Sequence, residues 1–245
     1  MRKSKMMLIG IVCAAFMLNL SAQETTKEFR PTKDTWITNE KQGTPGSRAD
    51  RGYGACKYLS LDTQSDGDKS HILLEFDLKD IPKGAKIGSA FLVMGPRIDP
   101  QVGSIKAVEI RRLLKDDWQE GKEGDKTHVA RTATSWMARS YSAEGESKWE
   151  KPGAVGDTDC DATAAVTVQE SEIKSLEADG LDILDLLNAW NKDRNVQFGL
   201  LIRTTNDKIN YLRWNSSNAG EGKGPKLVIM FTDNAAMEAK DKKDK

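Results

Sequence analysis

The stretch "HILLEFDL", residues 71–78, carries an apolar side chain at every second position, namely Ile72, Leu74, Phe76 and Leu78. An alternation with a period of two places these side chains on one face of a β-strand and buries that face. The turn sequence "IPKGAKI" follows at once, in which Pro82 fixes φ and Gly84 permits a left-handed backbone conformation. We therefore expect a strand here that turns into a second strand.

Similar strand patterns are scattered along most of the chain. They are "DTWI" (34–37), "YLSLD" (58–62), "GSAFLVMG" (88–95), "KAVEIRRLL" (106–114), "FGLLIRTT" (198–205), "YLRWNSS" (211–217) and "KLVIMF" (226–231). A single segment, Leu181–Trp190, has the apolar spacing of a helix, with Asp182 as a plausible N-cap. Many short strands with one brief helix predict an all-β fold, an antiparallel two-sheet β-sandwich.

The two ends of the chain differ from this central part. Residues 1–22 combine a basic start, an apolar run and the small pair Ser21-Ala22, which predicts a signal peptide. The apolar run is shorter than the roughly 20 residues of a membrane span, so we expect an exported protein without one, extracellular or periplasmic. Residues 23–33 are expected to be a loose extension, 34–233 the sandwich domain, and 234–245 a charged flexible tail.

Charge and cysteine content narrow the classes of partner. The chain has 37 Lys and Arg against 37 Asp and Glu, and removal of the three basic signal-peptide residues leaves 34 against 37. A nucleic-acid-binding protein usually has a basic surplus on one face, so we expect no nucleic-acid partner. Cys56 and Cys160 are the two cysteines outside the signal peptide. A cysteine pair in an exported chain predicts a disulfide bond between them.

The motifs of common enzymes are missing. Catalysis needs a nucleophile, a base and an orienting group that converge in one pocket. The two histidines are His71, which opens a strand, and His128, in a loop, and we expect both to be structural or surface residues. The sequence has no GxSxG, HExxH, CxxC or glycine-rich phosphate loop. We therefore expect a protein that is not an enzyme and requires no cofactor.

Three alternating aspartates, Asp157, Asp159 and Asp161, resemble the start of a calcium-binding loop. An EF-hand needs glycine at the sixth position of the loop and glutamate at the twelfth. Ala162 and Val168 occupy those positions, which rules out an EF-hand. A looser structural calcium site, made of the three carboxylates and backbone carbonyl groups, is the remaining expectation.

The order of several motifs resembles that of DNRLRE domains, a family that includes carbohydrate-binding module family 96 and modules of archaeal disaggregatase-related proteins. The resemblance extends from Asp34 to Phe231 and rests on motifs that occur in the family's order. They are "DTWI", "GYG", "ILLEFDLKDIPKGAKIGSAFL", "DDWQEG", "TSWMARS", "KWEKPGAVGDTD", "LDILDLLNAWNKDRNVQFGLLI" and "RWNSSNAGEGKGPKLVIMF". It implies a jelly-roll-like β-sandwich that binds acidic polysaccharides such as alginate.

Aromatic and basic side chains supply the candidate binding groups. The tryptophans are expected to be core anchors, with a sugar-stacking platform as the alternative. Arg112, Arg203 and Arg213 lie within strand patterns. A charge in a strand normally marks the solvent side, which accounts for Arg203 and Arg213 as it does for Arg111, whereas Arg112 shares the face of the apolar Val108 and Ile110. If they gather on one face, their guanidinium groups can bind the carboxylates of an acidic glycan.

The leading hypothesis is an exported, non-catalytic module for carbohydrate binding or surface attachment, with acidic polysaccharide as its partner. The first alternative is a structural or adhesive component of an envelope or extracellular assembly without a glycan ligand. A polysaccharide-degrading enzyme is the second alternative.

Overall fold

The computed structural model describes residues 24–41, 43, 47–63, 67–98, 107–122, 124, 131–162, 166–204 and 210–233. The expected signal peptide, the C-terminal tail and His128 lie outside these residues.

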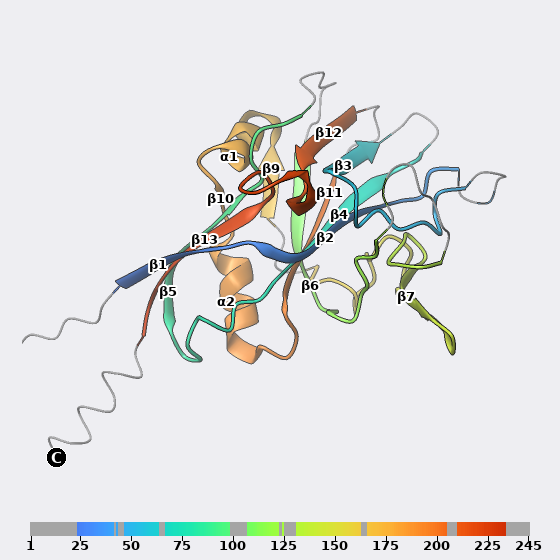
Figure 1. Ribbon diagram of the computed structural model, residues 1–245. Helices are drawn as coiled ribbons and strands as arrows, with labels where there is room; N and C mark the ends of the chain where they lie inside the picture. Colours follow the sequence, from blue (N-terminus) through green and yellow to red (C-terminus); the bar gives the residue numbers. More distant parts are fainter. Residues whose placement is uncertain are drawn as a thin grey trace, which may run out of the picture.

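The described strands form two main antiparallel sheets and two smaller ribbons (Figure 1). Sheet A contains, in spatial order, β1 (Glu24–Phe29), β13 (Lys226–Thr232), β5 (Lys86–Val93) and β10 (Leu181–Asp182). Sheet B contains β2 (Pro31–Thr38), β4 (Ser70–Phe76), β11 (Phe198–Thr204), β6 (Ala107–Leu113) and β9 (Val166–Gln169). The ribbons pair β3 (Tyr58–Thr63) with β12 (Asn210–Asn215), and β7 (Ala138–Ser142) with β8 (Gly145–Lys148). The predicted antiparallel β-sandwich is confirmed.

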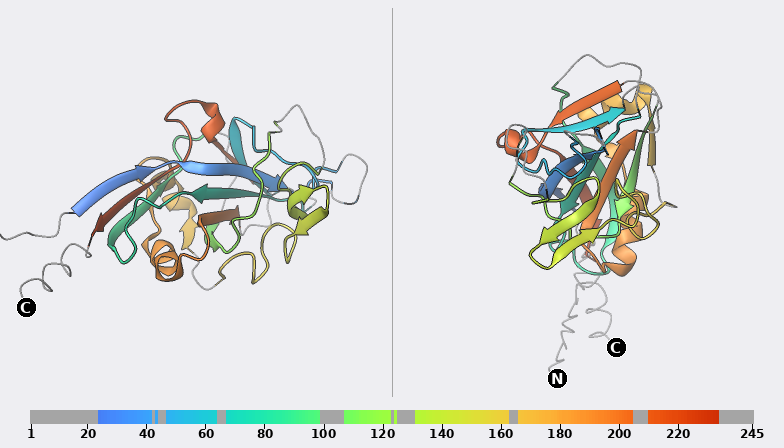
Figure 2. Two further views of the ribbon diagram at one scale, coloured as in Figure 1. Left: turned by 60° about the horizontal axis from the view of Figure 1, so that its bottom comes forward. Right: turned by 90° about the vertical axis from the view of Figure 1, so that its right-hand side faces the viewer.

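The main core lies between sheets A and B. The predicted alternation in β4 holds, because Ile72, Leu74 and Phe76 join one buried cluster. Leu92 of β5 and Leu227 of β13 belong to the same cluster from the side of sheet A. Burial of each such side chain stabilises the folded state by about 1.5–3 kcal/mol. Figure 2 shows the two layers from two further directions.

The far face of sheet B is also buried, which the alternation in β4 does not predict. Every residue of β4 is buried. On this far face, Leu73 and Leu201 form a second cluster with Trp118, Trp136 and Trp149. These tryptophans come from residues 114–122 and 131–162, which we call the covering segment. Apart from the β7–β8 hairpin it is largely irregular, so β4 is a central strand with loops, not water, on its second side.

Two helices and two short 3-10 helices complete the described chain. Helix α2 (Leu184–Asp193) begins three residues later than predicted, because Leu181 and Asp182 pair with β5 as strand β10. The side chain of Asp182 nevertheless accepts the N–H of Leu184 at 2.8 Å. Helix α1 (Ile173–Glu177), preceded by η1 (Glu170–Glu172), was not predicted. The other 3-10 helix is η2 (Ser217–Ala219).

The segment 23–33 was predicted to be loose, and this prediction is wrong. Strand β1 pairs with β13 over its whole length, from Glu24 opposite Thr232 to Phe29 opposite Leu227. Strand β2 then begins at Pro31. The polar side chains gave the wrong expectation because an edge strand is held by its backbone hydrogen bonds and needs to bury little.

The predicted disulfide is also absent, since no bond joins Cys56 to Cys160. Both side chains are buried, but they belong to different clusters. Cys56 lies in the core between the two sheets, and Cys160 lies under the covering segment on the far face of sheet B. A disulfide requires adjacent Cβ atoms, which this placement does not provide.

Candidate functional site

Arg112, the first candidate arginine, is buried in the interior of the sandwich. It is 8% exposed and lies on the same face of β6 as Val108 and Ile110, which belong to the main core. Its terminal nitrogens lie 3.6 Å from the carboxylate of Asp161 and 3.5 Å from that of Asp193. The guanidinium therefore links the covering segment to the end of α2.

Arg203 lies on the opposite face of sheet B and is bound to a glutamate. In the register of β11 and β6 it stands opposite Glu109, and its Nε atom contacts one carboxylate oxygen. Arg111 donates to the other oxygen at 2.7 Å. Burial opposes the ionisation of Glu109, but the two guanidinium groups outweigh it and hold its pKa below the usual value. Arg112 and Arg203 therefore do not gather on one face.

Arg213, the third candidate, lies between two tyrosine rings on the β3–β12 ribbon. Its guanidinium carbon is 5.0 Å from the ring centre of Tyr58 and 5.3 Å from that of Tyr211. All three side chains are half-buried. The alternating residues Leu212 and Trp214 point the other way, into the main core. We call Tyr58, Tyr211 and Arg213 the Arg213 surface.

A hydrogen-bond network holds the Arg213 guanidinium from one side. Its Nε atom donates to Ser60 Oγ at 3.4 Å, and Ser60 in turn donates to Asp62 Oδ2 at 3.0 Å. Ser70 donates to the same oxygen at 3.2 Å. Burial raises the pKa of Asp62 above its usual value, against the effect of these hydrogen bonds and of Arg213. Among the described residues, no acceptor bonds to the two terminal nitrogens of Arg213.

The three aspartates of the expected calcium site serve separate purposes. Asp159 is 1% exposed, whereas Asp157 is exposed and Asp161 pairs with Arg112. The carboxylate of Asp159 accepts three backbone N–H groups, from Glu150 at 3.0 Å and from Lys151 and Gly156 at 3.1 Å. Within the described ranges, no group of three or more metal-ligating side chains is found. The aspartate repeat therefore does not assemble the expected calcium site there.

The aromatic residues favour packing over a sugar platform. All six tryptophans are buried, none more than 8% exposed. Trp149 donates its indole N–H to the carbonyl of Ser135 at 2.9 Å. His71 packs its ring 4.6 Å from that of Trp136, and its Nδ1 atom hydrogen-bonds the carbonyl oxygen of Gly153 at 2.8 Å. The expectations of core tryptophans and a structural His71 are confirmed.

A pair of carboxyl groups that the sequence did not point to lies beside strand β2. Glu120 accepts the backbone N–H of Asp34 at 2.9 Å, and Asp34 is 1% exposed. Ser217 donates both its N–H, at 2.7 Å, and its hydroxyl, at 2.8 Å, to Asp34. Burial, together with the neighbouring Asp34 carboxyl, raises the pKa of Glu120 to about 7. No local motif marks this pair, because its members are far apart in the sequence.

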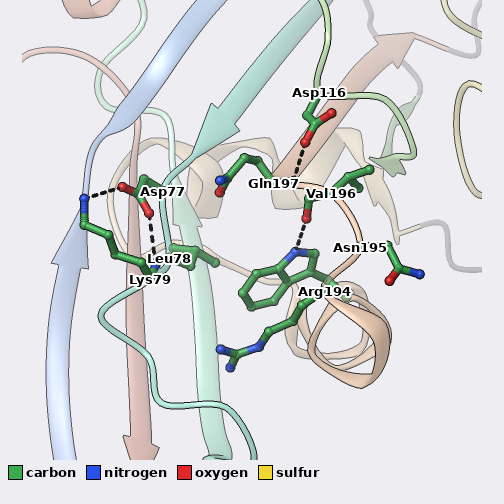
Figure 3. A pocket seen from close by; sticks show the side chains of 9 residues that line it. Asp77, Leu78, Lys79, Asp116, Arg194, Asn195, Val196 and Gln197 are labelled. Carbon is green, nitrogen blue, oxygen red and sulfur yellow. Dashed lines mark hydrogen bonds and ion pairs between the residues drawn. The ribbon is translucent and has the colours of Figure 1, made fainter.

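A small pocket at the C-terminal end of α2 is lined by charged and amide side chains (Figure 3). Its volume of about 240 Å³ is below the 300–1,000 Å³ of typical ligand sites. Its polar groups largely satisfy one another: Asp77 pairs with Lys79 at 2.7 Å, and Asp116 accepts the N–H of Gln197 at 3.1 Å. Arg194 covers the ring of Trp190 and donates to backbone carbonyl groups. This pocket is therefore a weaker candidate than the Arg213 surface.

Tyr58 and Tyr211 were missed as site residues, although their strands were recognised. The alternation in "YLSLD" and "YLRWN" puts both tyrosines on the face opposite the buried leucines. The pairing of β3 with β12 brings them together, and the sequence carries no signal for that pairing.

Comparison of the chain with protein-family models gives no match, and comparison with curated proteins gives none either. The resemblance to DNRLRE domains therefore stays a prediction. In the described part of the chain, neither helix has the length and apolar character needed to cross a membrane.

Proposed function

We propose that this chain is an exported, non-catalytic carbohydrate-binding module for acidic polysaccharides, and that Arg213 is its main ligand contact. The observation that carries the proposal is the position of Arg213 between Tyr58 and Tyr211, with no described acceptor on its terminal nitrogens. Arg112 and Arg203, by contrast, are already paired with carboxylates. Of the three candidate arginines, Arg213 is thus the one with capacity for a ligand.

The chemistry of these side chains suits a uronic-acid polymer. The planar guanidinium group binds a carboxylate through two parallel, charge-assisted hydrogen bonds. A neutral sugar has no carboxylate and cannot form this pair of bonds. The half-buried ring of Tyr211 offers apolar area to the C–H face of a sugar, whereas Tyr58 stacks on Trp36 with ring centres 6.0 Å apart and serves to support the guanidinium. The Ser60–Asp62 network fixes the direction of the guanidinium and lowers the entropy lost on binding.

The sequence adds independent support. A signal peptide, as expected for residues 1–22, would direct the protein to the periplasm or the cell exterior, where polysaccharides occur. The resemblance to DNRLRE domains implies a β-sandwich that binds acidic polysaccharides such as alginate. On this proposal the protein resembles members of that family in both fold and ligand class.

Affinity electrophoresis on gels containing alginate, other uronic-acid polymers or neutral glycans tests the proposal. We expect the acidic polymers alone to retard the full chain, and added salt to weaken the retardation. Because a charge-assisted hydrogen bond contributes about 1.5–3 kcal/mol, Arg213→Gln should weaken binding about ten- to a hundredfold. Lys151→Gln is a matched control, since it removes one exposed positive charge in the covering segment.

The alternatives predict different results. A structural or adhesive protein without a glycan ligand would show no retardation on any polymer, and that outcome would overturn the proposal. Release of reducing ends or unsaturated uronates from the same polymers would overturn the non-catalytic assignment. Equal retardation of Arg213→Gln and the unmodified chain would remove Arg213 from the site.

A further inference from the structure

A second cavity lies where the chain passes from sheet A to sheet B. It has a volume of about 410 Å³, within the range of small-molecule sites, and three of its lining residues are glycines. Its lining residues are Arg30, Pro31, Ser217, Gly220, Glu221, Gly222 and Gly224.

Arg30 supplies the positive charge of this cavity. Its Nη1 atom donates to the carbonyl groups of Gly224 at 3.0 Å and Gly222 at 3.5 Å. These two bonds hold the guanidinium against the loop. No carboxylate of the described residues forms an ion pair with it, in contrast to Arg112 and Arg203. Arg30 is therefore placed like Arg213, with one side of the guanidinium fixed and the rest available to a ligand.

The glycine loop itself is tied down at its base. Ser217 donates both of its polar hydrogens to the buried carboxylate of Asp34. A Cβ atom on Gly224 would lie 2.8 Å from the backbone nitrogen of Ser217, so only glycine permits this close approach of the two loop ends. Within the described residues, the backbone N–H groups of Glu221 and Gly222 have no acceptor. Backbone N–H groups without an acceptor, in a loop that a guanidinium also contacts, are suited to an anion.

The cavity is continuous along the chain with the Arg213 surface. Strand β12 ends at Asn215, opposite Tyr58, and the N–H of Ser216 bonds to the carbonyl of Lys57 at 3.1 Å. The loop that lines the cavity begins with the next residue. The second cavity and the Arg213 surface are therefore linked by a short stretch of chain, and a uronic-acid polymer carries the carboxylates that both would bind.

We propose that Arg30 and the loop Ser217–Gly224 form a second anion subsite, which binds the carboxylate of a uronic-acid residue. The nature of its ligand rests on the proposed function, but the subsite is made of residues different from those of the Arg213 surface. Glu221, whose side chain is exposed on the same loop, opposes an anion and limits its affinity.

Titration of the ¹⁵N-labelled full chain with sodium glucuronate, followed by the chemical shifts of its amide resonances, tests the subsite directly. We expect saturable shifts of the Glu221 and Gly222 amide resonances, no such shifts with glucose, and their loss in Arg30→Gln. Glu221→Gln should bind about twofold more tightly, because it removes one nearby negative charge. Lys151→Gln should titrate like the unmodified chain. Absent shifts, or equal shifts in Arg30→Gln, would overturn the subsite.

Affinity electrophoresis on alginate separates this inference from the proposed function. If the unmodified chain is retarded, Arg30→Gln should bind about tenfold more weakly and keep its dependence on Arg213. Retardation that Arg30→Gln leaves unchanged overturns the subsite while the proposed function stands. If alginate does not retard the chain, but glucuronate shifts Glu221 and Gly222 in an Arg30-dependent manner, the proposed function fails and the subsite stands.

Discussion

The two faces of sheet B are both buried, but by different kinds of structure. The first face packs against sheet A through alternating apolar side chains, such as Leu74 and Leu200. The second face packs under the covering segment, whose largest apolar side chains in this cluster are Trp118, Trp136 and Trp149.

The difference lies in how the backbone of each cover is satisfied. A strand in sheet A bonds its N–H and C=O groups to the neighbouring strand. In the covering segment, scattered backbone bonds such as that from the N–H of Gly153 to the carbonyl of Trp136 satisfy part of the backbone, and side chains satisfy further groups. Asp159 accepts three backbone N–H groups there, and His71 reaches from sheet B to the carbonyl of Gly153. The second cover therefore depends on buried polar side chains in addition to its tryptophans, whereas apolar side chains and strand pairing suffice for the first.

The largest effect that separates the two faces should come from Asp159→Ala. It leaves three backbone N–H groups without an acceptor, of which that of Gly156 is buried and those of Glu150 and Lys151 are partly buried, and we expect the free energy of unfolding to fall by about 3–5 kcal/mol. Leu74→Ala on the first face should cost a similar 2–5 kcal/mol or so by opening a cavity. Hydrogen exchange tells them apart.

In Asp159→Ala, amides of residues 150–161 should exchange faster than global unfolding explains, and in Leu74→Ala they should not. Equal local exchange in both variants would remove the distinction between the faces. A calcium-dependent rise in Tm that Asp159→Ala abolishes would instead make these aspartates metal ligands.

The next effect is the dependence of stability on pH through His71. Burial, aided by Arg203 and Lys69 and opposed by the Gly153 hydrogen bond, lowers its pKa to about 4. The folded state therefore favours the neutral form of His71. The contribution of His71 to the free energy of unfolding is complete above pH 6.5 and is lost as the pH falls toward 4. The loss amounts to about 3 kcal/mol. Urea unfolding between pH 4 and 7 should show this slope, and His71→Phe should lack it.

Glu120 should give a smaller effect of the opposite sign. Its pKa of about 7 means that the fold prefers the neutral carboxyl. The contribution of Glu120 to the free energy of unfolding is complete below pH 4.5 and is lost as the pH rises through 7. Glu120→Gln keeps an acceptor for the N–H of Asp34 and should flatten the profile in that window. If the variant instead steepens the loss of stability above pH 6, the carboxyl is ionised in the fold and this assignment is wrong.

The sequence predicted the first face of sheet B better than the second. Alternation in residues 72–78 identifies one buried face, because a strand against a sheet follows a simple period. The aspartate repeat did not reveal the role of Asp159 as a backbone acceptor, because a calcium loop and a set of backbone acceptors use the same residues. Strand register is likewise not encoded locally. Alternation puts Arg112 on the face of Val108 and Ile110, but nothing in the sequence shows on which side of the sheet Arg203 lies or brings Tyr58 to Arg213.

The pairing of β1 with β13 has a mechanical consequence. Glu24 and Thr232 lie opposite each other at one end of sheet A, so chain that continues from either strand leaves from the same place (Figure 1). A load pulling on both ends would act across this pair and break its hydrogen bonds one after another, rather than all at once. The domain should therefore yield at low force from its β1–β13 end. Tension carried through a ligand on the β3–β12 ribbon would reach the sandwich by a different route.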